Sequence, residues 1–163
     1  MSRLDSFIRR MSAQRDILNA VASMIGDIDG PVMELGLGNG RTYDHLREIL
    51  PGRRIVAFDR ELNSHGPSTP PAENLVLGEI AETAKAFIGC GAALVHADIG
   101  TGYDDRDALT LRWLPDLVHG LLGENGLAAS GLPLEREGLE PLALPEGIRP
   151  GRYFLYRKRT SPV

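Results

Sequence analysis

A loop in which glycine alternates with other residues is the stretch best suited to chemistry. Gly36, Gly38 and Gly40 stand in "ELGLGNG", directly after the apolar run "PVMEL" and directly before a segment with helical spacing. In a strand–loop–helix unit, such a loop presents main-chain N–H groups at the positive end of the helix. Gly36 is expected at the tight turn, Gly38 beneath a ligand, and Gly40 where the helix packs on the strand. The loop therefore predicts a small-ligand site at the carboxyl edge of a parallel sheet.

Two acids accompany this loop and indicate what it binds. Asp59 ends the apolar run "RRIVAFD" and follows Gly36 by 59 − 36 = 23 positions, close to the roughly 20 expected of an acid that accepts hydrogen bonds from ribose hydroxyls. A strand-end cap is the alternative role for Asp59. Glu34 precedes the first glycine by two residues, where it would repel a diphosphate and attract a ligand carrying an ammonium and a sulfonium.

The segment "VHADIGTGYDD" contains the candidate catalytic residues. His96 and Asp98 alternate along an expected strand, so they share one face, and either could hold or deprotonate a substrate. Tyr103 follows on a loop and could line the same pocket. His96 has a second interpretation, as a hydrogen-bonded histidine of the core. The other histidines lack ligand spacing with any His or Cys, so we expect no metal site.

Alternating apolar strands and helices predict the fold. Helical spacing covers 4–25, 41–50, 80–88 and 115–122, and apolar strand-like runs cover 31–36, 53–61, 73–79, 92–100 and 125–131. The segments 139–145 and 152–158 follow without a helix between them, which favours an antiparallel edge hairpin. We expect an α/β, Rossmann-like three-layer sandwich with a mostly parallel seven-stranded sheet. It would form one domain over 1–163, with an N-terminal helical segment 1–27, a binding core 28–131 and a closing hairpin 132–163.

Three segments leave their structure open. Ser2 and Asp5 could cap one long N-terminal helix, or Ser12 could divide it into two. The loop "LNSHGPSTPPAEN", residues 62–74, is too rich in proline for a regular helix and is either a lid or a surface loop. The short segment 132–150 leaves little room for a helix.

Composition limits the location and the partners. The 163 residues are 42% apolar and carry a net charge of −4, which lacks the basic excess typical of nucleic-acid binding. No membrane span or secretory signal is visible, and the lone Cys90, read as a packing residue, fits a reducing cytoplasm. Arginines near both ends are either solvated or hold an anionic substrate.

The motifs, in order, resemble those of class I S-adenosylmethionine-dependent methyltransferases. "ELGLGNG" resembles their glycine motif, "AFDRE" their second motif, "LGEIAE" their adenine segment, "HADIG" their fourth strand, and "LLGENGLAAS" their turn into the fifth strand. The resemblance covers about residues 28–131. It implies S-adenosyl-L-methionine as cofactor and a cofactor site formed by Glu34, Gly36, Gly38, Asn39, Gly40, Thr42, Tyr43, Asp59, Arg60, Glu79, Ile80 and Asp98.

The resemblance also implies roles at the adenosine end. Asp59 would bind both ribose hydroxyls, and Arg60 would lie over the adenine. Glu79 would accept a hydrogen bond from the adenine amino group, with Ile80 packed on the ring. Glu79 has an alternative as a simple N-terminal acid of a helix.

At the methionine end the implied roles involve four residues. Glu34 would orient the amino-acid end directly or through water, and Thr42 and Tyr43 could reach the carboxylate. Asp98 would lie beside the methionine moiety or the incoming substrate. Tyr43 could instead be core packing.

The expected function is methyl transfer to a small molecule. No "NPPY" or "DPPY" sequence follows the fourth strand, which together with the acidic charge argues against nucleic acid. The acceptor pocket would come from the N-terminal helix and loops, or from a second subunit in a homo-oligomer. The alternatives are a sensor or partner subunit that binds the cofactor without transferring methyl, and an NAD-type Rossmann oxidoreductase, which the glycine spacing disfavours.

Overall fold

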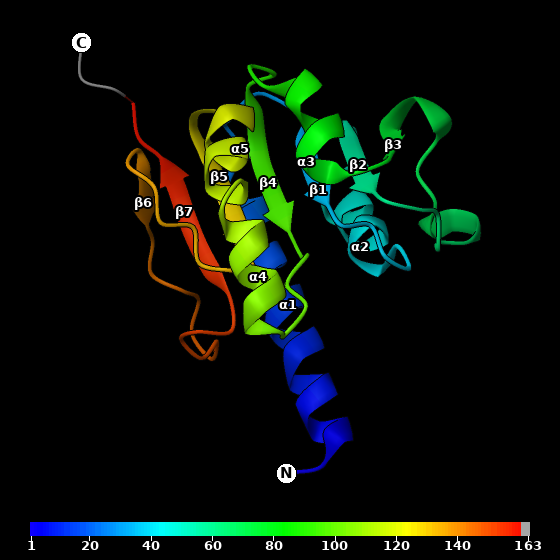
Figure 1. The fold of residues 1–163 in the computed structure, drawn as a ribbon, viewed down its shortest axis with the longest axis vertical. Coiled ribbons are helices and arrows are strands. Elements are labelled where there is room, and N and C mark those ends of the chain that lie inside the picture. Colours follow the sequence, from blue (N-terminus) through cyan, green and yellow to red (C-terminus); the bar gives the residue numbers. More distant parts are fainter. Residues whose placement is uncertain (161–163) are drawn as a thin grey trace.

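The apolar runs of the chain assemble into one seven-stranded sheet, described over residues 1–160 by a computed structural model (Figure 1). The strand order is β3-β2-β1-β4-β5-β7-β6. Neighbours among the first five strands run parallel, and β7 runs antiparallel to both β5 and β6. The strands are β1 Val32–Leu35, β2 Ile55–Asp59, β3 Leu75–Leu77, β4 Ala92–Ala97, β5 Leu122–Ser130, β6 Leu139–Pro141 and β7 Phe154–Lys158. This arrangement confirms the predicted Rossmann-like sheet with its antiparallel C-terminal edge.

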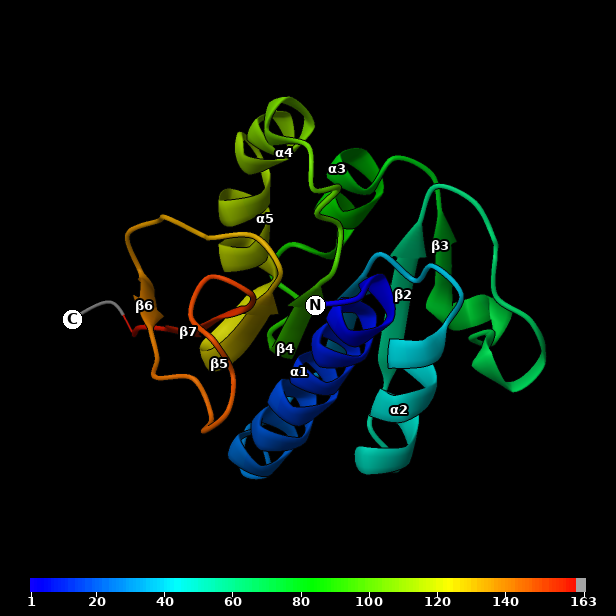
Figure 2. The same ribbon diagram turned by 90° about the horizontal axis from the view of Figure 1, so that it is seen from below.

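Helices cover both faces of this sheet (Figure 2). Helices α1 and α2 pack side by side on one face, and α3, α4 and α5 lie on the other. Because both faces are covered, every residue of β1 and β4 is buried. The helices are α1 Arg3–Met24, α2 Arg41–Ile49, α3 Ile80–Thr83, α4 Asp104–Leu111 and α5 Leu114–Leu121, with 3₁₀ turns η1 Gly66–Ser68, η2 Ala72–Asn74 and η3 Ala84–Phe87.

The first helix is continuous. The Ser2 hydroxyl accepts from the Asp5 N–H at 3.0 Å while the Asp5 carboxylate accepts from the Ser2 N–H, which completes the predicted capping box. Ser12 does not divide the helix. The N-terminal half of α1 extends past the carboxyl ends of the strands (Figure 1), so its side chains can form a wall above that edge.

Two helical expectations differ from the structure. The helix expected over 80–88 is one α-turn followed by the 3₁₀ turn η3. Helix α4 was not predicted because none of its side chains is buried, so it has no apolar periodicity to reveal it. Its Asp107 carboxylate instead accepts hydrogen bonds from the Thr101 and Gly102 N–H groups and ties the loop after β4 to the helix.

The proline-rich loop 62–74 forms no α-helix, as predicted, and contains η1 and η2. It packs against α2, and Ser64 within it is buried. The described part of the chain contains no helix long and apolar enough to cross a membrane.

Candidate functional site

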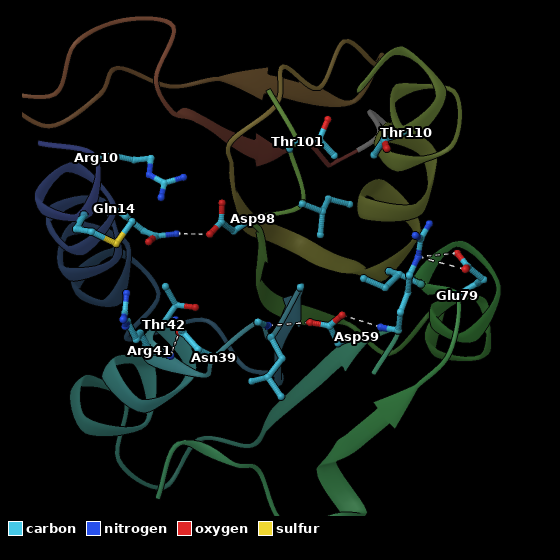
Figure 3. A pocket seen from close by; sticks show the side chains of 18 of the residues that line it. Arg10, Gln14, Asn39, Arg41, Thr42, Asp59, Glu79, Asp98, Thr101 and Thr110 are labelled. Carbon is cyan, nitrogen blue, oxygen red and sulfur yellow. Dashed lines mark hydrogen bonds and ion pairs between the residues drawn. The ribbon is translucent and has the colours of Figure 1, made fainter. Parts of the chain in front are cut away.

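A cavity of about 500 Å³ opens at the carboxyl ends of β1, β2 and β4, within the size range of small-molecule sites, roughly 300–1,000 Å³. Figure 3 shows its side chains arranged around a common space, with Arg10 and Arg41 on the α1–α2 side and Glu79 on the opposite side. The structure brings nine of the predicted residues to this cavity: Gly36, Gly38, Asn39, Thr42, Asp59, Arg60, Glu79, Ile80 and Asp98. No residue of the loop 62–74 lines it, so that loop is not a lid in this structure.

The three loop glycines serve different contacts. A Cβ on Gly36 would lie 2.9 Å from the Asp98 carbonyl oxygen, so the loop needs glycine to pass the end of β4. A Cβ on Gly38 would meet nothing within 4 Å, and its main chain is open to the cavity, as predicted. A Cβ on Gly40 would overlap the Ser68 carbonyl oxygen, and Gly40 does not line the cavity. The expectation that Gly40 serves helix–strand packing is therefore corrected: it accommodates the η1 turn.

Asp59 links the end of β2 to the glycine loop. Its Oδ2 accepts from the Gly38 N–H at 2.7 Å, and its Oδ1 accepts from the Arg60 N–H at 2.7 Å. The carboxylate is therefore held in the cavity by main-chain donors, with further lone pairs available to a ligand. Beside it, Arg60 pairs with Glu79 at 3.2 Å, and both side chains are largely exposed. Glu79 also stands at the N-cap of α3, although its carboxylate makes no capping hydrogen bond.

Asp98 follows β4 and is held from α1. Gln14 Nε2 donates to Asp98 Oδ2 at 2.8 Å and to the Tyr153 hydroxyl oxygen at 2.9 Å (Figure 3 shows the first of these bonds). Gln14 and Tyr153 are 5% and 4% exposed. The N-terminal helix and the segment preceding β7 thus meet at the one predicted catalytic residue that lines the cavity.

Behind the cavity wall, a buried chain of hydrogen bonds continues from Tyr153. The Tyr153 hydroxyl lies 2.7 Å from His96 Nε2, and His96 Nδ1 lies 2.9 Å from both carboxylate oxygens of Glu34. Thr42 Oγ1, which lines the cavity, donates to Glu34 Oε1 at 2.9 Å. Glu34 and His96 are adjacent because their strands pair in that register, and neither has any exposed surface. The chain of polar groups thus starts and ends at the cavity.

Burial and nearby carboxylates act in opposite directions on the pKa of His96 and in the same direction on the pKa of Tyr153. Burial is the largest single influence on the pKa of His96, and it lowers this pKa. The charge and hydrogen bond of Glu34, together with the charge of Asp98, raise it. The pKa of His96 therefore lies above its ordinary value of 6.5. Burial, and after it the charge of Asp98, raises the pKa of Tyr153 far above its ordinary value of 10. The phenol therefore stays protonated and serves as a hydrogen-bonding group rather than as a base.

Several predicted residues do not reach the cavity. Glu34 and His96 act at most through Thr42 and Tyr153, so His96 cannot contact a substrate directly and matches its alternative as a core histidine. Tyr43 is buried between α1, α2 and the sheet. Tyr103 is 62% exposed, with the Arg106 guanidinium 4.9 Å from its ring centre, which corrects the expectation that it lines the pocket.

The sequence predicted contributions from the N-terminal helix and from the chain after the fourth strand, but it did not identify most of the residues that make them. Gln14 stands between Met11 and Leu18 on the apolar stripe of α1, and a polar residue there was a usable signal. Arg10 belongs to the N-terminal arginines for which an anion-binding role was left open. The other missed residues carry no comparable signal. They line the cavity from α1, the glycine loop, α2 and the chain after β4: Phe7, Met11, Leu37, Arg41, Ile99, Gly100, Thr101, Thr110 and Trp113.

Neither metal-ion chemistry nor thiol chemistry has a site in the described structure. Across residues 1–160, no group of three or more His, Cys, Asp or Glu side chains could hold a metal ion. Cys90 is half-buried, its thiol donates to the Leu121 carbonyl oxygen at 3.4 Å, and burial raises its pKa. A raised pKa keeps the thiol protonated and unreactive.

Comparison with known proteins supports a cofactor-dependent transferase. The chain is similar to an S-adenosyl-L-methionine methyltransferase from Silicibacter pomeroyi DSS-3, at 44% identity and a TM-score of 0.89, over 97% of this chain and 99% of that one. The fold is shared with the antibiotic-resistance methyltransferase Kmr (12% identity, TM-score 0.57, 85% and 91% covered). It is also shared with a probable spermidine synthase from Corynebacterium glutamicum ATCC 13032 (14%, 0.59, 91% and 63%). No curated protein showed significant similarity.

A family model described as S-adenosyl-L-methionine methyltransferase matches residues 1–158. That match spans the cavity, α1 and the C-terminal strands, and it agrees with the resemblance carried by the glycine loop and Asp59. It leaves no support for the NAD-type alternative. The chain therefore belongs to the S-adenosyl-L-methionine methyltransferase family and uses S-adenosyl-L-methionine as its cofactor.

Proposed function

We propose that this methyltransferase acts on a small molecule and holds its cofactor across the carboxyl edge of the sheet. The observation that carries the cofactor placement is the position of three carboxylates, Asp59, Glu79 and Asp98, at the ends of β2, β3 and β4 around one cavity. S-adenosyl-L-methionine carries a sulfonium and an ammonium, so an acid-lined cavity with an open glycine main chain fits it.

The adenosine end would lie between β2 and α3. Asp59 has lone pairs free for the ribose hydroxyls after its two main-chain bonds. Glu79 would accept from the adenine amino group, with Arg60 holding its carboxylate at the rim. Ile80 and Trp113 give the ring two apolar contacts.

The methionine end would lie between α1 and the loop after β4. Asp98 would accept from the ammonium through the oxygen that Gln14 leaves free. The Arg10 guanidinium, near Asp98 in Figure 3, would bind the carboxylate, whereas the Thr42 hydroxyl, whose proton goes to Glu34, would accept from the ammonium. Glu34 would act only by fixing the Thr42 hydroxyl.

The chain's residues would align and dehydrate the reactants rather than move a proton. When bound, the cofactor supplies a methyl group whose bonding electron pair stays on sulfur, while a lone pair of the acceptor forms the new bond. His96 and Tyr153 are buried away from the cavity, and Asp98 is committed to Gln14 and the ammonium. Without a free base at this point, an acceptor with an already deprotonated nucleophile is favoured.

Transfer of a radiolabelled methyl group tests the acceptor class. The enzyme would be incubated with methyl-labelled cofactor and a cell extract separated into metabolite, RNA and protein fractions. We expect label in the metabolite fraction, and expect Asp59→Ala to reduce it strongly when the cofactor is kept well below saturation. Label appearing in RNA or protein instead would reject a small-molecule acceptor.

Because a second subunit remains the other proposed source of pocket residues, the mass of the protein in solution would be measured by light scattering.

A further inference from the structure

A second concavity, here called the α1–α2 groove, adjoins the cofactor cavity. It has a volume of about 370 Å³ and runs between the two helices that cover one face of the sheet. It shares five residues with the cofactor cavity: Phe7, Met11, Gln14, Arg41 and Thr42. A molecule seated in the groove would therefore reach the cavity beside Thr42 and Gln14, at the proposed methionine end of the cofactor.

The groove and the cavity differ in charge. The cavity is lined by Asp59, Glu79 and Asp98, whereas the groove is lined by no carboxylate. The basic groups along the groove are Arg15, Arg41 and His45. A charged lining discriminates between ligands mainly because it repels a ligand whose charge has the same sign. A cationic cofactor thus fits the cavity, and an anion fits the groove.

Arg41 is the guanidinium available to that anion. Arg15 is bonded to Asp16 at 3.0 Å, and His45 Nε2 lies 2.8 Å from Asn19 Oδ1. Arg41 uses only its main-chain N–H, in a bond to Asn39, and its side chain has no hydrogen bond or ion pair within residues 1–160. An unpaired guanidinium at the mouth of a site matches a planar acid group in a bidentate way.

Most of the remaining surface of the groove is apolar. Phe7 is 42% exposed although it lies on the cavity side of α1, and Met11 and Leu18 continue the same wall. An exposed aromatic ring next to a thioether offers contact to an apolar body of adaptable shape. The lining therefore combines one guanidinium without an ion-pair partner in residues 1–160, that of Arg41, with a largely hydrocarbon surface.

We infer that the α1–α2 groove is the methyl-acceptor site and takes a small molecule with an apolar body and one acidic group, held by Arg41. This inference rests on the proposed small-molecule function and names its substrate class. A carboxylate near Arg41 could belong to the acceptor or to the methionine end of the cofactor. The structure favours the acceptor, because Arg41 lines both the cavity and the groove, whereas Arg10 lines the cavity and not the groove.

The test uses three probes that share a naphthalene body and carry an anionic, a neutral or a cationic substituent: 2-naphthoate, 2-naphthylmethanol and 2-naphthylmethylamine. Their binding would be measured by calorimetry on the full chain, with and without saturating S-adenosylhomocysteine. We expect naphthoate to bind in preference to the other two, and Arg41→Gln to weaken it by about tenfold or more, as for the loss of a hydrogen bond to a charged group. Affinity for S-adenosylhomocysteine should stay unchanged in this variant.

Arg47→Gln is the matched control. Arg47 is on the same helix, pairs with Asp44 at 2.7 Å and lines neither concavity, so this variant should bind both ligands normally. Equal binding of the three probes, or no binding of naphthoate, would overturn the inference. The inference would also fail if Arg41→Gln weakened the binding of S-adenosylhomocysteine instead, since Arg41 would then serve the cofactor. Failure of the wild-type chain to bind S-adenosylhomocysteine would reject the proposed cofactor site, while the naphthoate measurements made without it would still report on the groove.

Discussion

The cavity rim and the buried chain behind it draw polar residues from neighbouring strands of one sheet, but the two sets of residues have different surroundings. At the rim, Glu79 and Arg60 form an ion pair whose side chains are 62% and 74% exposed. Behind the wall, Glu34 and His96 are fully buried and in contact with Thr42 and Tyr153. The rim groups keep lone pairs free for a ligand, whereas the buried groups use theirs on one another. The rim residues are therefore suited to ligand binding, whereas the buried residues hold the rim residues in position.

Removing the buried carboxylate should have the largest effect. Glu34→Ala removes the carboxylate that raises the His96 pKa and leaves the buried His96 Nδ1 and Thr42 Oγ1 without their partner, and loss of one member of a buried pair costs about 3–5 kcal/mol of unfolding free energy. Glu79→Ala breaks the exposed pair and should cost less than about 1 kcal/mol. Urea denaturation of both variants measures the contrast. Similar losses in the two would show that burial does not distinguish the pairs.

Asp59→Ala should separate binding from stability at the rim. We expect S-adenosylhomocysteine affinity to fall by about 10- to 100-fold, because hydrogen bonds to a charged group contribute roughly 1.5–3 kcal/mol. Calorimetry measures this, with Asp104→Ala, on the exposed first turn of α4, as the control. Unchanged affinity would remove Asp59 from the cofactor site.

The loop glycines offer a finer test of the same distinction. Gly40→Ala would overlap the Ser68 carbonyl at a positive φ of 82° and should lower the unfolding free energy by about 2 kcal/mol or more. Gly38→Ala, at a φ of 53° with open space beside it, should cost about 1–2 kcal/mol in folding and should also reduce cofactor affinity. Thermal unfolding and calorimetry on each variant give both readouts. A Gly40→Ala protein as stable as wild type would contradict the packing assigned to that residue.

The smallest effect concerns pH. His96 has a folded-state pKa above its ordinary 6.5, so its contribution to stability is complete below about 6.5 and is lost as pH rises through the folded-state pKa. Unfolding free energy should therefore fall between pH 6 and 9 by more in wild type than in His96→Gln. Tyr153→Phe keeps the imidazole and should retain the wild-type slope. Parallel profiles for wild type and His96→Gln would mean that His96 does not change protonation on folding.

The sequence predicted the sheet and most of the rim because both depend on local patterns. Apolar runs located all seven strands, and glycine spacing with Asp59 located the cofactor loop. Helix α4 was not predicted because none of its side chains is fully buried, and Tyr103 could not be oriented from its position in a loop. Gln14 and Tyr153 join Asp98 and His96 across 84 and 57 positions. Such contacts depend on how helices pack, which no local spacing encodes.

A structure of the protein with S-adenosylhomocysteine tests the central claim most directly. The account predicts the adenosyl group along Gly36–Gly40, with the ribose hydroxyls on Asp59 and the adenine beside Ile80. It also predicts the amino-acid end between Asp98 and Arg10, leaving the α1–α2 groove open. Ligand density in the groove, or anywhere away from the glycine loop, would contradict it.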